Sequence, residues 1–190
     1  MDPETLARAV EAVLFASPEP VPLGRLVDLF GPEGADRQAV LEALARLEQA
    51  LAGRAVEVRE VAGGYQLRTR PEFAPFLARL EVPRPVRFSR AALETLAIVA
   101  YRQPVTRAEV EEVRGVDCGG VLKSLSEKGL VRIVGKKDVP GRPLLYGTTR
   151  KFLEVFGLAS LADLPSLQEI EELLAQEEGE PGGPEAARDG

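Results

Sequence analysis

The residues of this chain that could perform chemistry are few, and their spacing favours binding over catalysis. The sequence contains no histidine, which removes the commonest general base and the commonest metal ligand. Its single cysteine, Cys118, cannot build a thiolate metal cluster within one chain, and no phosphate-cradling GxxxxGKS or GxxxxGKT loop occurs. The adjacent carboxylates Glu111 and Glu112 would point in different directions on a helix. We therefore expect no enzyme, no cofactor and no metal site.

The composition permits folded domains and argues against a membrane protein. The 190 residues suffice for one or two small domains, and an apolar content of 45% allows real cores. No run approaches the ~18 apolar residues of a membrane span, and the N-terminus lacks the basic start of a signal peptide. A single cysteine suits a reducing compartment, so we expect a cytoplasmic protein.

The elements that would position binding residues are clearest between residues 88 and 165. Ser89 is expected to cap a helix that ends before Pro104, because proline removes a donor and disfavours helix in the residue before it. Helical spacing predicts one apolar face for this helix, formed by Leu93, Leu96, Ala97, Ala100 and Tyr101.

Two further helices and a hairpin are predicted to follow. Thr106 and Glu109 match the capping box of a second helix, and Asp117 is expected to cap the third. Gly129 suits the left-handed residue of a Schellman ending. The order helix, helix, helix, strand, loop, strand is that of a winged helix, with residues 135–143 as the wing.

Residues 1–82 repeat the same order of elements. Gly63-Gly64 is a two-residue hairpin signal between two strands. Pro20-Val21 aligns with Pro104-Val105 at a shift of 84, and Tyr65 aligns with Tyr146 at a shift of 81. We interpret the chain as two tandem winged helices, an α+β fold that is mainly α with small β-hairpins; chance similarity of amphipathic patterns is the alternative. We expect residues 81–87, with Pro83 and Pro85, to be a short stiff linker. The domain boundary is placed within this linker, so the first domain covers residues 1–82 and the second covers residues 83–165.

Charge and composition set the last 25 residues apart from both domains. The net charge is −4 over residues 1–82, +5 over residues 83–165 and −7 over residues 166–190. The final segment begins with an apolar stripe of Leu167, Ile170, Leu173 and Leu174, which could pack on its own domain or bind a partner. The remainder is glycine, proline and acid, and we expect it to be disordered.

The second half contains longer motifs that resemble a known family. The stretches AYRQPVTRAEVEEVRGV, GLVRIVG, VPGRPLLYGTT and KFLEVFGLASLADLP are similar to the bacterial segregation and condensation protein B family. The resemblance is strong from Ser89 to Leu164 and weaker over the first domain. It implies a non-catalytic subunit of the SMC condensin complex, which supports chromosome condensation and segregation during cell division.

The resemblance also implies partners and a place in the cell. Proteins of this family form homodimers, mainly through the first domain, and bind the kleisin subunit, segregation and condensation protein A. The kleisin in turn bridges the heads of the SMC ATPase. A cytoplasmic protein associated with the nucleoid is expected, with no membrane partner.

Candidate binding residues follow from the motif and from residue type. Tyrosine and arginine most often carry interface energy, so the kleisin-binding candidates gather around the corner after the first helix of the second domain. They are Tyr101, Arg102, Gln103, Arg107, Arg114, Arg142, Tyr146 and Thr148. The dimer-interface candidates on the first helix of the chain are Val10, Val13, Leu14 and Phe15.

A winged-helix transcription regulator is the alternative function. Lys123, Lys128, Lys136 and Lys137 are candidates for weak DNA contacts, expected to reach phosphate groups. The predicted recognition helix offers Gly119, Gly120 and Ser124 but few groups that read base edges. We therefore expect DNA binding to be weak or indirect.

Overall fold

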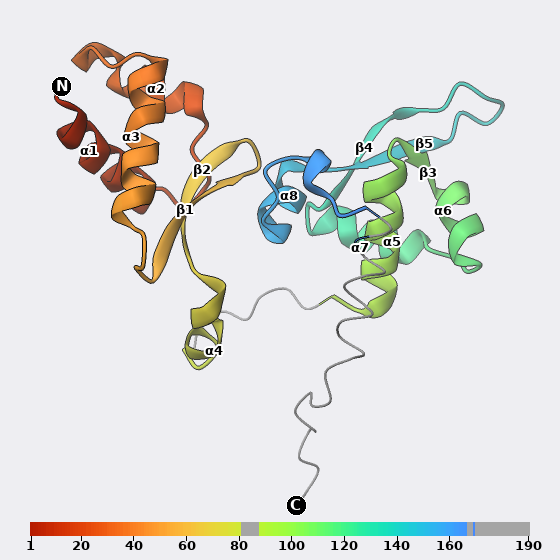
Figure 1. The fold of residues 1–190 in the computed structure, drawn as a ribbon. Helices are drawn as coiled ribbons and strands as arrows, with labels where there is room; N and C mark the ends of the chain where they lie inside the picture. Colours follow the sequence, from red (N-terminus) through yellow and green to blue (C-terminus); the bar gives the residue numbers. More distant parts are fainter. Residues whose placement is uncertain (81–87, 167–168, 170–190) are drawn as a thin grey trace, which may run out of the picture.

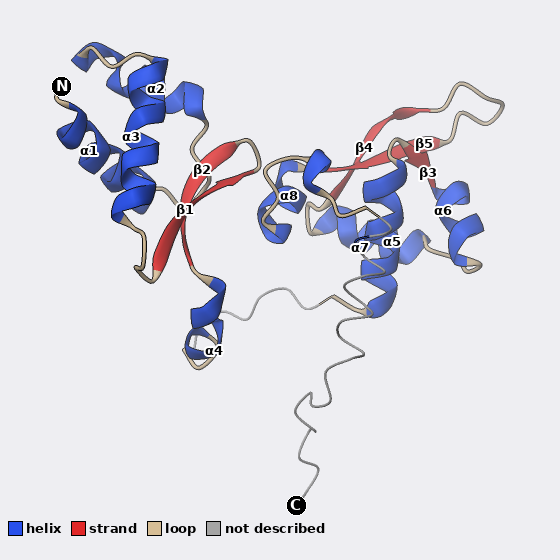
Figure 2. Ribbon diagram, in the orientation of Figure 1, coloured by secondary structure: helices blue, strands red, loops and turns tan. Residues whose placement is uncertain are grey.

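The computed structural model describes residues 1–80, 88–166 and 169. The predicted linker at residues 81–87, all four residues of the predicted apolar stripe and the acidic tail from residue 177 lie outside the described residues. Within the described part, no helix is long and apolar enough to cross a membrane. The described residues form two winged-helix domains, one built from α1–α4 with a two-stranded hairpin and one from α5–α8 with a three-stranded sheet (Figures 1 and 2).

The first domain has three helices followed by an antiparallel hairpin. Its elements are α1 (Pro3–Ala16), α2 (Leu23–Phe30), α3 (Arg37–Ala50), β1 (Val56–Val61) and β2 (Gly64–Thr69). The Asp2 side chain caps α1 by accepting from two backbone N–H groups, and Asp36 caps α3. Apolar residues from all three helices form one core cluster, against which the hairpin packs.

The hairpin turn lies one residue earlier than the sequence predicted. Val61 pairs with Gly64, so the turn residues are Ala62 and Gly63, both with positive φ. Gly64 instead begins β2, where an added Cβ would lie 2.8 Å from the backbone of Val21. The second glycine therefore serves a close backbone approach and not the turn.

A short helix follows the hairpin and leaves apolar side chains in solvent. A 3-10 turn (Pro71–Phe73) leads into α4 (Ala74–Leu77). Phe76 is 63% exposed and Leu80 is 59% exposed. The first domain thus presents apolar area at its C-terminal end.

The second domain repeats the arrangement with a third strand. Its elements are α5 (Arg90–Arg102), β3 (Val105–Thr106), α6 (Arg107–Arg114), α7 (Gly119–Glu127), β4 (Val131–Lys136), β5 (Leu144–Thr148) and α8 (Arg150–Phe156). The strand order is β3-β5-β4, all antiparallel. The wing loop covers residues 137–143, slightly shorter than predicted because β4 extends through Lys136.

Most predicted helix ends of the second domain are confirmed, with one correction. Thr106 and Glu109 form the capping box of α6. Gly129 has a φ of 72°, and Leu130 N–H donates to the Leu125 carbonyl at 2.9 Å, as in a Schellman ending. The predicted N-cap of α7, Asp117, was wrong by one residue, because Cys118 occupies the N-cap position. The Asp117 carboxylate still accepts a hydrogen bond from the N–H of Gly119, the first residue of α7.

The repeat predicted from the sequence is confirmed in the strand pairing. Val21 forms an isolated antiparallel bridge with Tyr65 in the first domain. At the aligned positions of the second domain, Val105 pairs with Tyr146. The same connection between the first helix and the hairpin therefore closes both domains.

The hairpin of the first domain is docked on the second domain. The N–H groups of Ala62 and Gly63 donate to the carbonyls of Leu158 and Ala159 at 2.8 and 3.0 Å. Arg68 donates to the Glu154 carbonyl at 2.9 Å. In the opposite direction, Arg150 donates to the Pro20 carbonyl at 2.9 Å. Figure 1 shows the tip between β1 and β2 facing α8.

Candidate functional site

The corner between α5 and α6 is held rigid by a glutamine that pairs with the wing strand. The Gln103 amide group donates to the Thr148 hydroxyl at 3.0 Å, and its oxygen accepts from the Thr148 backbone N–H at 2.8 Å. An added Cβ at Gly147 would lie 2.9 Å from this oxygen, so glycine leaves room for the pair. Gln103 and Thr148 were both predicted to bind the kleisin, but their polar groups hydrogen-bond each other.

Arg107 sits in an ion cluster that fixes the turn between α6 and α7. It contacts Glu111 at 2.6 Å and also pairs with Asp117. Glu111 accepts in addition from the Cys118 backbone N–H at 3.0 Å. The hydrogen bond from Arg107, followed by that from Cys118, lowers the pKa of the Glu111 carboxyl. Arg107 is half exposed, so one side of its guanidinium remains accessible.

Arg114 is not available as a surface anchor. Only 8% of its side chain is exposed, and its nearest acidic partner, Glu94 on α5, lies 3.4 Å away. Within the described part of the chain, its buried Nε has no hydrogen-bond partner. Arg114 therefore ties the end of α6 to α5 and does not face outward.

Tyr101 and Arg102 end α5 in different ways. Tyr101 is 44% exposed, and its hydroxyl donates to the Pro165 carbonyl at 2.5 Å. This contact joins residues 64 positions apart and secures the end of the described chain. Arg102, by contrast, is exposed in the last turn of the helix. The Tyr101 hydroxyl is therefore already hydrogen-bonded within the chain, whereas the Arg102 side chain is exposed to solvent.

The candidate residues of the wing differ in exposure and in their contacts. Arg142 is exposed at the loop, with a φ of 39°, and Tyr146 is half-buried on the central strand β5. Lys137 pairs with Glu109 at the base of the wing. That ion pair, followed by the hydrogen bonds from Thr106, lowers the pKa of Glu109 to about 2. The wing is therefore tethered to α6 at its base and free at its tip.

The other candidate lysines lie on exposed surface. Lys136 is exposed at the end of β4. Lys123 is within 3.9 Å of Glu127 on the same helix. Lys128 donates to the Ser124 hydroxyl at 3.1 Å. Of these three lysines, Lys123 thus has an acidic neighbour that partly offsets its charge.

The four dimer candidates on α1 divide into core and surface. Val10 and Leu14 are buried at 0% and 2% exposure in their own domain's core, and Val13 is half-buried. Phe15 is 84% exposed. Helical geometry places adjacent residues on different faces, so Phe15 alone of the four offers a large free side chain.

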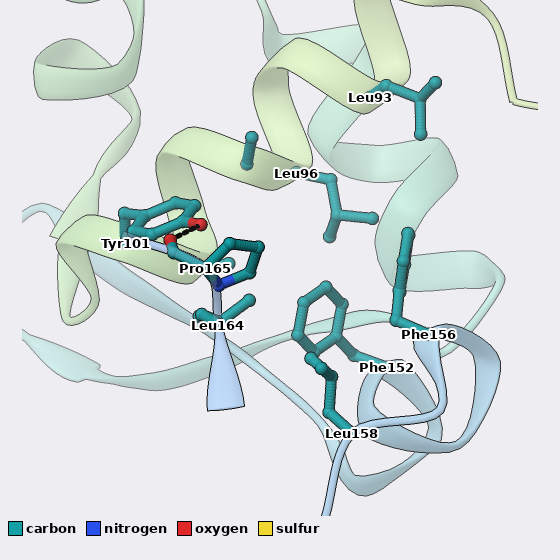
Figure 3. A pocket seen from close by; sticks show the side chains of 10 residues that line it. Leu93, Leu96, Tyr101, Phe152, Phe156, Leu158, Leu164 and Pro165 are labelled. Atoms are coloured by element: carbon teal, nitrogen blue, oxygen red, sulfur yellow. Dashed lines mark hydrogen bonds between the residues drawn. The ribbon is translucent and has the colours of Figure 1, made fainter. Parts of the chain in front are cut away.

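An apolar pocket in the second domain was missed as a site by the sequence analysis. It has a volume of about 390 Å³ and lies between α5, α8 and residues 158–165 (Figure 3). The α5 residues that line it are Leu93, Leu96, Ala97, Ala100 and Tyr101. These are the residues predicted to form one apolar face of the helix, and the prediction is confirmed because all five line the same pocket. Leu96 and Ala100 on this face are buried, whereas Leu93, Ala97 and Tyr101 are exposed.

The acidic and cysteine side chains of the described residues are dispersed. No group of three or more cysteine and acidic side chains is placed to hold a metal ion within residues 1–80, 88–166 and 169. Cys118 is fully buried, and burial raises the pKa of its thiol. The accessible features described above are the apolar pocket along α5 and the arginine-bearing corner between α5 and α6. Together with the fold, they define a tandem winged-helix protein.

Comparison with known proteins places this chain in a family. It belongs to the family of segregation and condensation complex subunit ScpB, which it matches over residues 8–167. Segregation and condensation protein B of Syntrophotalea carbinolica is 58% identical, over 94% of this chain and 90% of that protein. The protein of the same name from Moorella thermoacetica is 50% identical, over 88% of this chain and 85% of that protein.

Solved structures of related proteins were also found. ScpB from Mycobacterium tuberculosis is 36% identical, covers 83% of this chain and 98% of its own, and gives a TM-score of 0.38. A dimer of a ScpB N-terminal domain complexed with a ScpA peptide is 24% identical, over 43% of this chain and 93% of that one, with a TM-score of 0.37.

Proposed function

We propose that this chain is a non-catalytic subunit of the bacterial SMC–kleisin condensin complex. It binds the kleisin as a homodimer and so acts at the nucleoid in chromosome condensation and segregation. The observation that carries this proposal is the family match over residues 8–167, joined by relatives named segregation and condensation protein B at up to 58% identity. The absence of histidine in the sequence is compatible with a binding role.

The dimer is proposed to form through the first domain. Phe15 on α1 is 84% exposed, and Phe76 and Leu80 at the domain's end are 63% and 59% exposed. Large exposed apolar side chains of this kind mark interaction surfaces when they gather. A stable interface needs to bury roughly 1,200 Å² or more, and these aromatic rings supply its anchors.

The kleisin surface is proposed to lie at the corner between α5 and α6. Of the eight predicted residues, Arg102, Arg107 and Arg142 are exposed arginines, of which Arg107 is also paired with Glu111 and Asp117. The corner is rigid because of the Gln103–Thr148 pair and the α6 capping box, which lowers the ordering cost of binding. Arginine donors suit the carbonyls and carboxylates of a bound segment.

Calorimetric titration of the full chain with a kleisin fragment tests this proposal. Arg102→Ala should weaken the complex by about 1–3 kcal/mol if this arginine is a hot spot. The matched control is Arg132→Ala, which removes an exposed arginine from β4 on the wing. Circular dichroism checks that both variants fold. Equal affinity of both variants and the parent would remove Arg102 from the interface, and no complex with the parent would overturn the proposed function itself.

DNA binding separates this function from a transcription regulator. The chain has a net charge of −6, and the phosphate backbone dominates affinity for DNA. The isolated protein should therefore bind duplex DNA only weakly at physiological salt, as measured by fluorescence anisotropy. Nanomolar, sequence-selective binding would instead favour the regulator.

A further inference from the structure

The apolar groove along α5 lacks a cover among the described residues. Leu93 and Tyr101 at its two ends are each 44% exposed, and Phe156 across the groove is 42% exposed. Phe152 and Leu158 form its floor and far wall (Figure 3). A stripe that pairs exposed leucine and phenylalanine with a buried floor is stabilised when another apolar surface covers it.

The last residues of the second domain, before the predicted amphipathic segment, lie at the edge of this groove. Leu164 and Pro165 line it, and the hydroxyl of Tyr101 holds the Pro165 carbonyl at 2.5 Å. A 3-10 turn at Leu161–Asp163, with its own capping box, directs the chain there. The next residue, Ser166, therefore begins at the Tyr101 end of the stripe.

Ser166 and Glu169 carry the start signal of a helix. The Ser166 N–H donates to the Glu169 carboxylate at 2.7 Å, and the Glu169 N–H donates to the Ser166 hydroxyl at 3.2 Å. These reciprocal bonds form a capping box, which marks a helix N-terminus. They also lower the pKa of the Glu169 carboxyl. The described residues therefore place a helix-start signal at the edge of the groove.

The sequence beyond this cap has the apolar spacing that the groove requires. Leu167, Ile170, Leu173 and Leu174 recur at helical intervals, whereas Glu172 falls on the opposite side and Glu171 at the edge of the stripe. In a helix, the seven intervals from Leu167 to Leu174 would span about 10 Å, and the eight intervals from Leu93 to Tyr101 span about 12 Å. The apolar stripe on the tail therefore fits within the length of the stripe on α5.

We propose that residues 166–176 dock as an amphipathic helix in the groove between α5 and α8, antiparallel to α5. In this arrangement Leu167 lies near Tyr101, and Leu173 and Leu174 lie near Leu93. The segment is joined directly to the groove wall at Pro165, so its effective concentration exceeds that of a free partner. The docked helix completes the second domain's apolar packing, with Glu172 facing solvent and Glu171 at the rim of the groove.

An engineered disulfide tests the position of the segment in the full chain. Leu93→Cys combined with Leu174→Cys should form an intrachain disulfide under mild oxidation. The matched control combines Leu93→Cys with Glu172→Cys, which places the thiol on the other helix face, and should react much more slowly. Cys118 is fully buried, so it contributes little background. Equal rates for the two pairs, or linkage only between two chains, would overturn the proposal.

A second variant tests whether the segment covers the groove. Ile170→Asp should release the helix and raise the fluorescence of the apolar dye 8-anilinonaphthalene-1-sulfonate about threefold or more, because such dyes report exposed apolar surface. Glu171→Gln is the control and should leave the signal unchanged. An unchanged signal for Ile170→Asp would contradict the proposal. Both experiments use the isolated chain, so their failure leaves the kleisin proposal intact.

Discussion

The two winged-helix domains share one order of elements but use their hairpins in opposite ways. In the first domain the strands meet at the two-residue turn Ala62–Gly63, and that tip is docked on residues 158–159 of the second domain. In the second domain the strands are joined by the loop 137–143, which projects away from the helices in Figure 1. A tight tip packs against another domain, whereas a long basic loop remains on the surface.

The two domains also differ in their helix caps and in the residues at aligned positions. The second domain has a capping box at the start of α6, whereas α2 begins after Pro22 without a side-chain cap. The first domain has Gly64 where the second has Leu145. The same fold is therefore compatible with different helix caps and turn residues, provided that the segment after the first helix pairs with the hairpin.

The largest expected effect comes from removing the close approach that only the first domain has. Gly64→Ala would place a Cβ 2.8 Å from the Val21 backbone and 3.0 Å from that of Pro20. Backbone cannot move aside as a flexible side chain does, so we expect a loss of about 2–3 kcal/mol in the free energy of unfolding. Urea denaturation followed by circular dichroism measures it. Leu145→Ala at the aligned position should cost less, since that residue is only half-buried.

A smaller effect is expected from undocking the first hairpin. The double variant Arg68→Ala, Arg150→Ala removes both guanidinium contacts to carbonyls of the other domain. Hydrogen bonds from charged groups contribute about 1.5–3 kcal/mol when buried, and these half-buried ones should contribute about 1–2 kcal/mol together. Scanning calorimetry should show the unfolding of the two domains moving apart in temperature. An unchanged profile, like that of the control Arg132→Ala, would mean that the tip is not an energetic link.

The smallest effect is a pH dependence confined to the second domain. The folded pKa of Glu109 is about 2, below the ordinary 4.5, because its ionised form pairs with Lys137 and accepts from Thr106. A depressed carboxyl pKa means that the stabilisation is fully present above pH 4.5 and is lost as the pH falls towards 2. Glu109→Gln should therefore lower the melting temperature at pH 6 and match the parent near pH 2. Glu112→Gln, on the same helix, is the control; a gap that persists at pH 2 would exclude this ion pair as the cause.

Short-range signals in the sequence determined most element boundaries. Ser89 and the Thr106–Glu109 capping box are each followed by the predicted helix, since a cap depends only on the next three residues. The tandem repeat was also readable, because it is encoded in spacing. The family was recognisable for a similar reason: its motifs are contiguous stretches of the chain.

Tertiary structure alone decided which faces are covered. On α5, periodicity defined an apolar stripe but could not tell that Leu93 and Tyr101 would line an open groove. On α1, it could not tell that Leu14 would be buried while Phe15 stays in solvent. The Gln103–Thr148 pair, the burial of Arg114 and the docking of the hairpin tip also join residues 20 or more positions apart. Burial depends on what packs against a face, and those partners come from distant parts of the chain.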